Sequence, residues 1–273
     1  MTTAETGTWH HGLVARWWAE FNVAEPGELG FYRSAIRRFG EPALDLACGT
    51  GRLLRPLLAE GVEVEGADIS ADMLALCEEH ARRDGLQPVL HRHAMHELDL
   101  PKRYRTIYIC DSFGIGGSRP NDLETLRRVR RHLAPGGTLV FNMYLPFDGH
   151  DAESWGRWLP DGRASIPRPW PEAGERRTTT DGDEIELISR LADLDPLLQR
   201  HTLEMRARLW HDGKVVADEE HLLLENLYFL PEILLMLDVA GFGHVEVEAG
   251  YTGREATRDD SMLAVIARPG AAP

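Results

Sequence analysis

The chain has 273 residues, of which 43% are hydrophobic and 27% charged, a balance typical of a globular protein that buries a large core. Its formal net charge of −14 argues against a general nucleic-acid binder, because phosphate binding depends on clustered Lys and Arg. The three cysteines lack metal-ligand spacing, the N-terminus carries no signal-peptide pattern, and no apolar run approaches the ~18 residues of a membrane span. We therefore expect a cytoplasmic protein with reduced thiols, either a monomer or a homodimer.

Helix-like and strand-like runs alternate through the first half of the chain. Residues 9–40 predict an amphipathic helical pair rich in aromatic side chains. Beyond them, strands are expected at Pro42–Ala47, Val62–Asp68, Pro88–His93, Thr106–Cys110 and Thr138–Tyr144, and helices at Gly51–Glu60, Ala71–Asp84 and Asp122–Leu133. Strands separated by helices of this length predict an α/β protein with a parallel, doubly wound sheet, whose ligand binds at the carboxyl ends of the strands.

The pattern changes after Tyr144. Residues 145–180 are rich in Pro, Gly and Trp and predict a long ordered connection. Three strand-like runs follow, at Glu184–Leu194, Leu198–Trp210 and Lys214–Glu225, and Asp212-Gly213 between the last two is a strong hairpin signal. These runs predict a three-stranded antiparallel meander. A helix at Pro231–Ala240 and strands at Val245–Ala249 and Met262–Ala267 then complete a seven-stranded main sheet, its last two strands antiparallel.

A glycine turn and an acidic residue suggest a nucleoside site. Gly49 and Gly51 follow the first predicted strand, and Asp68 ends the second, where a carboxylate can accept hydrogen bonds from both ribose hydroxyls. A dinucleotide fingerprint needs a third small residue, but Leu54 occupies that position, and no Gly-Lys-Ser/Thr occurs. Asp45, before the turn, suits a cationic ligand that carries an amino group. The site therefore favours S-adenosylmethionine over NAD, and an NAD-linked oxidoreductase is a distant alternative.

Three motifs occur in order between residues 45 and 139: Asp45-Leu-Ala-Cys-Gly-Thr-Gly51, Gly66-Ala-Asp-Ile-Ser-Ala-Asp-Met73 and Leu133-Ala-Pro-Gly-Gly-Thr-Leu139. Together they resemble the class I S-adenosylmethionine-dependent methyltransferases, in particular small-molecule enzymes with an inserted antiparallel sheet. The resemblance implies S-adenosylmethionine as the cofactor and S-adenosylhomocysteine as the product. It also implies three parts: a helical lid at residues 1–40, a Rossmann-like cofactor domain at 41–144 and 226–273, and an insertion at 145–225 that covers the acceptor site.

The resemblance also implies which residues contact the cofactor. The expected set is Tyr32, Ala47, Gly49, Gly51, Asp68, Ile69, Met73, Ala94, Met95, Asp111 and Phe113. Relatives often place an acid at the position of Ala94, where it accepts from the adenine amine, so this sequence departs from the family there. Backbone groups at Ala94 and Met95, or the side chains of His93 or His96, are the alternatives.

The acceptor side is less defined. Tyr144 and His150 follow the fifth predicted strand and are the nearest downstream groups able to orient or deprotonate an acceptor; the alternative is that both are ordinary loop residues. Trp18, Trp155 and Trp170 are candidates for the wall of an apolar acceptor pocket, or for packing only. The histidines of residues 91–96 lack the spacing of a known zinc site, so no metal is expected.

The expected function is methyl transfer from S-adenosylmethionine to a nitrogen or oxygen of a small molecule, such as a natural-product intermediate. A neutral amine can attack the methyl group unaided, whereas a hydroxyl needs a base, so the sequence leaves the methylated atom open. Two alternatives stand beside this expectation: a peptide or protein N-terminal methyltransferase, and a catalytically silent S-adenosylmethionine-binding partner protein.

Overall fold

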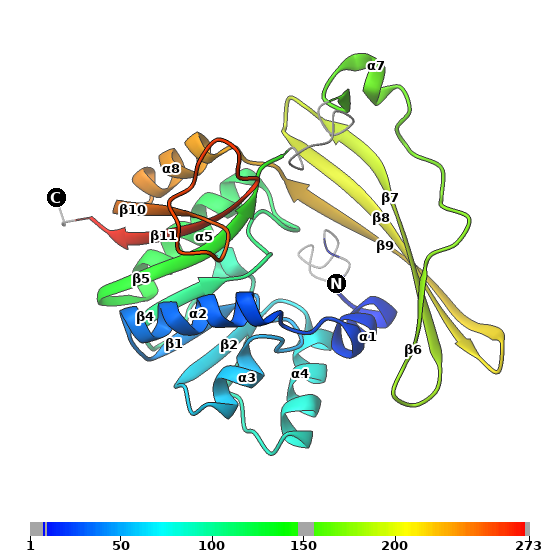
Figure 1. The fold of residues 1–273 in the computed structure, drawn as a ribbon, viewed down its shortest axis with the longest axis horizontal. Helices are drawn as coiled ribbons and strands as arrows, with labels where there is room; N and C mark the ends of the chain where they lie inside the picture. The colour runs from blue at the N-terminus through cyan, green and yellow to red at the C-terminus, as the bar shows by residue number, and fades with distance from the viewer. Residues whose placement is uncertain (1–7, 9, 147–155, 271–273) are drawn as a thin grey trace.

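The computed structural model describes residues 8, 10–146 and 156–270, and two β-sheets form its framework (Figure 1). The larger sheet has the strand order β10-β11-β5-β4-β1-β2-β3. Its strands are β1 (Ala43–Leu46), β2 (Val64–Asp68), β3 (Leu90–Arg92), β4 (Tyr104–Ile109), β5 (Leu133–Tyr144), β10 (Phe242–Ala249) and β11 (Met262–Pro269). Strands β1 to β5 pair in parallel, whereas β11 runs antiparallel to both β5 and β10. The predicted seven-stranded sheet with a final antiparallel pair is confirmed.

Helices cover both faces of this sheet, as a doubly wound fold requires. The helices among the described residues are α1 (Gly12–Phe21), α2 (Pro26–Phe39), α3 (Leu54–Ala59), α4 (Ala71–Arg83), the 3₁₀ turn η1 (Met95–Glu97), α5 (Arg119–His132), α7 (Pro160–Arg163) and α8 (Leu230–Val239). One buried cluster joins α2, α3 and α4 to the sheet, and a second joins α5 and α8 to it. None of the described helices is long and apolar enough to cross a membrane.

The second sheet is antiparallel and has the order β6-β7-β8-β9. Its strands are β6 (Glu175–Thr178), β7 (Glu184–Asp195), β8 (Arg200–His211) and β9 (Lys214–Asn226). The hairpin between β8 and β9 is confirmed, since Asp212 and Gly213 have φ values of 47° and 73°. This sheet has four strands, so the prediction of a three-stranded meander was wrong. All four residues of β6, Glu-Arg-Arg-Thr, are exposed and show no apolar alternation, so its pairing with β7 identifies it as a strand.

Helix α1 joins the two sheets (Figure 1). Leu13 and Val14 pack into a third buried cluster with Met205 of β8 and Leu223 of β9. The first main-chain nitrogens of α1 donate to carboxylates on either side: Gly12 to Asp72 of α4, and Leu13 to Glu219 of β9, both at 2.8 Å. A carboxylate at a helix N-terminus is favoured by the helix dipole. The two N-terminal helices therefore pack on different sheets: α2 on the main sheet and α1 on the second.

Candidate active site

A cavity of about 710 Å³ lies at the carboxyl ends of β1, β2, β3 and β4. Helix α1 contributes Trp18 to its wall, and the second sheet contributes Arg200 and Leu224. Ligands of doubly wound folds bind at this edge of the sheet, near the first strand. The cavity is thus enclosed by the three segments that the sequence divides into a helical N-terminus, a cofactor domain and an insertion.

The turn after β1 brings main-chain atoms to the cavity. Ala47 and Gly49 both line it and have φ values of 69° and 55°, in the left-handed region that favours glycine. The nitrogens of Ala47 and Cys48 both donate to the carbonyl oxygen of Ala67, which fixes the turn to the end of β2. A Cβ on Gly49 would have no atom within 4 Å, so this glycine leaves open space at the wall. Gly51 has a different role, because a Cβ there would lie 2.5 Å from Cys77 Sγ.

Asp68 lies at the end of β2 with its carboxylate fixed by the main chain. Its Oδ2 accepts from Gly49 N at 2.9 Å and its Oδ1 from Ser70 N at 2.8 Å. Burial raises the pKa of Asp68, and these backbone hydrogen bonds oppose that shift. Each carboxylate oxygen can accept a further hydrogen bond, so the side chain is oriented and still able to bind two hydroxyl donors. The alternative of capping beside Ser70 and the ligand-binding role are compatible.

Asp45 is buried next to the turn and lines the same cavity. Burial raises its pKa to about 7; the charge of Arg52 acts in the opposite direction, while Asp68 and Glu28 add to the rise. Near neutral pH this carboxyl group therefore gains or loses a proton in response to the charge of a neighbouring ligand.

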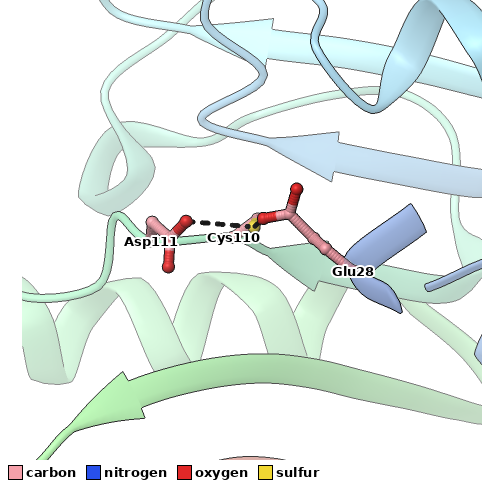
Figure 2. Close-up of side chains that lie close together, drawn as sticks. All are labelled: Glu28, Cys110 and Asp111. Carbon is pink, nitrogen blue, oxygen red and sulfur yellow. Dashed lines mark hydrogen bonds between the residues drawn. The ribbon is translucent and has the colours of Figure 1, made fainter. Parts of the chain in front are cut away.

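Cys110 and Asp111, which line the cavity at the end of β4, lie close to Glu28 of α2 (Figure 2). Cys110 Sγ donates to Glu28 Oε1 at 3.1 Å and lies 3.6 Å from Asp111 Oδ2. Arg52 forms ion pairs with Glu28 and, at 3.1 Å, with Asp111. Among the described residues, Glu28, Cys110 and Asp111 are the one group whose ligand atoms lie close enough together to hold a metal ion. The guanidinium already supplies the positive charge, and burial raises the pKa of Cys110, so its thiol is neutral.

Asn142 of β5 holds Asp111 in its unusual conformation. Asp111 has a φ of 52°, its nitrogen donates to Asn142 Oδ1 at 2.8 Å, and Asn142 Nδ2 donates to Asp111 Oδ1. Tyr32 also donates to Asn142 Oδ1, at 3.1 Å. Because the amide binds both the main chain and the side chain of Asp111, this carboxylate is positioned at the cavity wall before any ligand arrives.

Ile69, Met73, Ala94 and Met95 form one wall of the cavity, and the Ala94 side chain carries no hydrogen-bonding group. The polar side chains nearby that also line the cavity are His93, His96, Glu97 and Asn121. Asn121 Nδ2 lies 3.2 Å from His96 Nε2, which holds the amide in place.

Several residues expected at the site lie elsewhere. Tyr32 is fully buried among aromatic rings of the core and does not line the cavity. Phe113 packs on Phe141 and Tyr228, with ring centroids 5.2 and 5.8 Å away. Each ring fills the apolar core below the cavity, which motif position alone does not reveal.

The acceptor candidates are more dispersed. Trp18 lines the cavity, whereas Tyr144 does not and is 59% exposed. Trp170 lies under the guanidinium of Arg190, 4.5 Å from its ring centroid, and is not part of the cavity wall. His150 and Trp155 lie outside the described residues.

Sequence reasoning also missed residues at the cavity. Arg52 directly follows the glycine turn, and that adjacency was the available signal. Glu28 and Asn142 could not be recognised from the sequence, because an acid on a helix and an amide in a strand are ordinary.

Asp122, buried at the start of α5, accepts from Asn226 Nδ2 at 2.8 Å and Tyr228 Oη at 2.7 Å. These bonds attach the end of β9 to the main domain.

Comparison with known proteins agrees with this geometry. Residues 43–137 match a family described as a methyltransferase domain. The chain is 39% identical over 111 residues to dTDP-3-amino-3,6-dideoxy-alpha-D-glucopyranose N,N-dimethyltransferase of Streptomyces fradiae, covering 38% of this chain and 41% of that protein. It is 30% identical over 142 residues to the putative methyltransferase YqeM of Bacillus subtilis (strain 168), covering 50% and 51%. The aligned part thus spans about half, or less, of these curated relatives.

Solved structures resemble nearly the whole chain. An S-adenosylmethionine-dependent methyltransferase from Clostridium acetobutylicum ATCC 824 superimposes with a TM-score of 0.69 at 18% identity, covering 94% of this chain and 98% of that one. The sugar N-methyltransferase KedS8 from Streptoalloteichus sp ATCC 53650 gives 0.67 at 18% identity, covering 98% and 99%. At these identities the likeness establishes the fold. Residues 43–137 therefore match a methyltransferase-domain family, and the chain has the fold of these S-adenosylmethionine-dependent methyltransferases.

Proposed function

We propose that the protein transfers a methyl group from S-adenosylmethionine to a nitrogen of a small molecule. The observation that carries this proposal is the oriented carboxylate of Asp68 beside the glycine turn, in a cavity at the carboxyl ends of the parallel strands. Asp68 would bind both ribose hydroxyls, and Ala47 and Gly49 would line the methionine part. Ile69, Met73, Ala94 and Met95 would enclose the adenine.

The charge of the cavity supports a cationic donor and an amine acceptor. Five carboxyl groups line it, against two guanidinium groups. Of the two, Arg52 is already paired with Glu28 and Asp111. Burial, with a smaller contribution from His11, lowers the pKa of cavity-lining His10 to about 4, so this imidazole is neutral and does not oppose a cation. A negative site attracts a sulfonium ion and an ammonium group, whereas a neutral hydroxyl gains less from it.

The chemical step needs positioning more than a dedicated catalyst. The acceptor nitrogen forms a bond to the methyl carbon as the carbon–sulfur bond breaks, and the electron pair of that bond stays on sulfur, giving a neutral thioether. We propose that Asp111, held by Asn142, orients the acceptor amine and takes up its proton. Although Tyr144 is 59% exposed as a whole residue, partial desolvation, followed by the charge of Asp111, raises its pKa, so its hydroxyl stays protonated and would act as a donor instead of a base.

We further propose that residues 1–40 and 145–225 complete the acceptor side. Trp18 of α1 and Arg200 and Leu224 of the second sheet line the cavity opposite the strand ends. A water-excluding cover strengthens the electrostatic interactions beneath it. The names of the Streptomyces fradiae relative and of KedS8 both describe sugar N-methyltransferases, which supports nitrogen as the methylated atom.

Calorimetry and turnover test this function together. S-adenosylmethionine and S-adenosylhomocysteine should bind with one site per chain, and NAD should not bind. Release of S-adenosylhomocysteine in the presence of amino-sugar or aryl amines should then exceed release with the matching alcohols. Binding without turnover on any amine would favour the silent partner protein, and turnover on peptides alone would favour an N-terminal methyltransferase.

A further inference from the structure

A second cavity, of about 440 Å³, lies between α1 and the second sheet. None of the residues that line it belongs to the main sheet. Its apolar wall consists of Trp17, Trp18 and Phe21 of α1, Leu187 and Ile188 of β7, Met205 of β8, and Pro171 and Ala173. The rings of Trp17 and Phe21 meet edge to face with centroids 4.6 Å apart, so contacts within α1 fix this aromatic surface. A wall formed in advance binds a rigid apolar group with little ordering cost.

The second cavity adjoins the main one. Trp18 and Asn22 line both, and so form the wall that the two share. A ligand that occupied both cavities would therefore lie against these two side chains. The two volumes, about 710 and 440 Å³, each fall within the range of ligand sites.

Trp18 also carries a hydrogen-bond donor that is not satisfied. Its indole nitrogen Nε1 is buried and has no hydrogen-bond partner among the described residues. A buried N–H without an acceptor is unfavourable, and such groups in native proteins usually bind water or a ligand. An oxygen of a bound molecule would satisfy this donor once the indole turned toward the cavity.

Charge at the second cavity is balanced. Arg177 Nε donates to Glu175 Oε1 at 2.6 Å, and these are the charged residues of its lining. The guanidinium of Arg177 lies 5.4 Å from the ring centroid of Trp17, a cation–π arrangement that further occupies it. With its two charges paired, the cavity offers nothing to a phosphate and suits a neutral group.

We infer that the second cavity holds a neutral, ring-bearing apolar portion of the methyl acceptor, with an oxygen at the Trp18 indole, while its amine lies in the main cavity. This inference rests on the proposed function and narrows its substrate class. It favours an amine on an apolar ring system over an amine on a nucleotide-linked sugar, because a diphosphate would need unpaired cations that neither cavity lining supplies beyond Arg200.

A fluorescent probe tests the cavity directly. The probe is 6-propionyl-2-dimethylaminonaphthalene, a neutral naphthalene with a ketone oxygen, titrated in the presence of S-adenosylhomocysteine. Met205→Trp fills the second cavity without touching the main one, and should weaken probe binding about tenfold or more. Ala173→Leu narrows the cavity from an exposed position of the opposite wall and should act in the same direction. Trp18→Phe keeps an aromatic ring but removes the N–H, and should weaken binding about twofold to tenfold.

Val216→Trp is the matched control, since it adds the same side chain at an exposed position of the same sheet. Probe affinities of Met205→Trp and Ala173→Leu equal to that of Val216→Trp would overturn the inference. Affinity for S-adenosylhomocysteine should be unchanged in Met205→Trp, Ala173→Leu and Val216→Trp, whose positions do not line the main cavity. If the wild-type protein did not bind S-adenosylhomocysteine, the proposed function would be contradicted instead. A failure of the proposed function is thus distinguishable from a failure of this inference.

Turnover distinguishes the acceptor classes. With 2-naphthylmethylamine and a dTDP-linked amino sugar as competing acceptors, the naphthyl amine should give the higher kcat/KM in the wild-type protein. Met205→Trp should reduce that preference, and Val216→Trp should preserve it. A preference for the nucleotide-linked sugar that Met205→Trp leaves unchanged would also overturn the inference.

Discussion

The Oδ2 atom of Asp68 lies 2.9 Å from the main-chain nitrogen of Gly49, so the end of β2 fixes the turn that follows β1. The two parts of the predicted nucleoside site are thus bonded to each other before any ligand is present. Such an arrangement lowers the ordering cost of binding, because the carboxylate is already oriented.

Replacing Asp68 by Ala should weaken S-adenosylhomocysteine binding by ~1–3 kcal/mol, since hydrogen bonds to a charged group are among the stronger ones. Calorimetry measures the loss, and Asp259→Ala, in an exposed loop, is the control. Because the variant also removes the acceptor for Gly49 N, its stability should be compared as well. An unchanged affinity in a folded variant would reject the ribose role.

Replacing Ala94 by Asp should tighten S-adenosylhomocysteine binding by up to about tenfold, because it supplies an acceptor for the adenine amine. The gain should vanish with the inosyl analogue, which has no exocyclic amine. Ala94→Leu adds a side chain of similar size without oxygens and should weaken binding to both ligands. If Ala94→Asp and Ala94→Leu changed the affinity for S-adenosylhomocysteine equally, adenine would lie away from Ala94.

The ionisation of Asp45 should make stability depend on pH. Burial raises its pKa in the folded protein to about 7, from an ordinary value of 3.8. The folded state therefore holds this proton more tightly than the unfolded state. The associated stability is fully present below pH 3.8 and is lost as the pH rises through 7.

Asp45→Asn removes this titration. Its free energy of unfolding relative to the wild type should increase between about pH 5 and pH 7, with a slope on the order of 1.4 kcal/mol per pH unit. Urea denaturation at several pH values measures the difference. Asp259→Asn, which changes an exposed acid, should follow the wild type; identical pH profiles for both variants would contradict the assignment.

Binding of the cationic cofactor should favour the ionised form of Asp45. S-adenosylmethionine should therefore release a fraction of a proton near pH 7, detected as a dependence of the calorimetric enthalpy on the buffer. The neutral thioether S-adenosylhomocysteine should release less. Asp45→Asn should abolish the difference between the two ligands, and a difference that persists would place the released proton elsewhere.

Replacing Arg52 by Met should destabilise the protein by about 3–5 kcal/mol, because it leaves the buried carboxylate of Glu28 without its cation. Adding Glu28→Gln should restore part of the loss. Thermal and urea denaturation of the single and double variants measure the coupling between these residues. Additive losses would show that the ion pair contributes nothing beyond the two separate side chains.

Local motifs made the position of the cavity at the strand ends predictable. Gly49 and Asp68 each belong to a short pattern at a strand end, and strand ends in a parallel sheet meet at one edge. The number of strands in the main sheet followed from the same alternation of apolar runs.

Contacts between distant segments were not predictable in the same way. Glu28 and Arg52 are 24 residues apart, and a single sequence does not show that a helical acid faces a guanidinium in the interior. Tyr32 was expected at a ligand, but packing drew its ring into the core. The strand β6 has exposed side chains only, so its single structural signal is main-chain pairing, which leaves no trace in side-chain pattern.

The position of α1 has a consequence for how the acceptor half can change. The second sheet is attached at the end of β9, through Asn226 and Asp122, and again through Glu219, which receives the Leu13 N–H. Leu187 of β7 and Met205 of β8 pack in the cluster that contains Leu13 and Val14 of α1. A pocket for another acceptor could therefore be obtained by exchanging side chains on that sheet, with the donor half left as it is. Under the proposed function, the side chains that bind the methyl donor and those that bind the acceptor would then change independently.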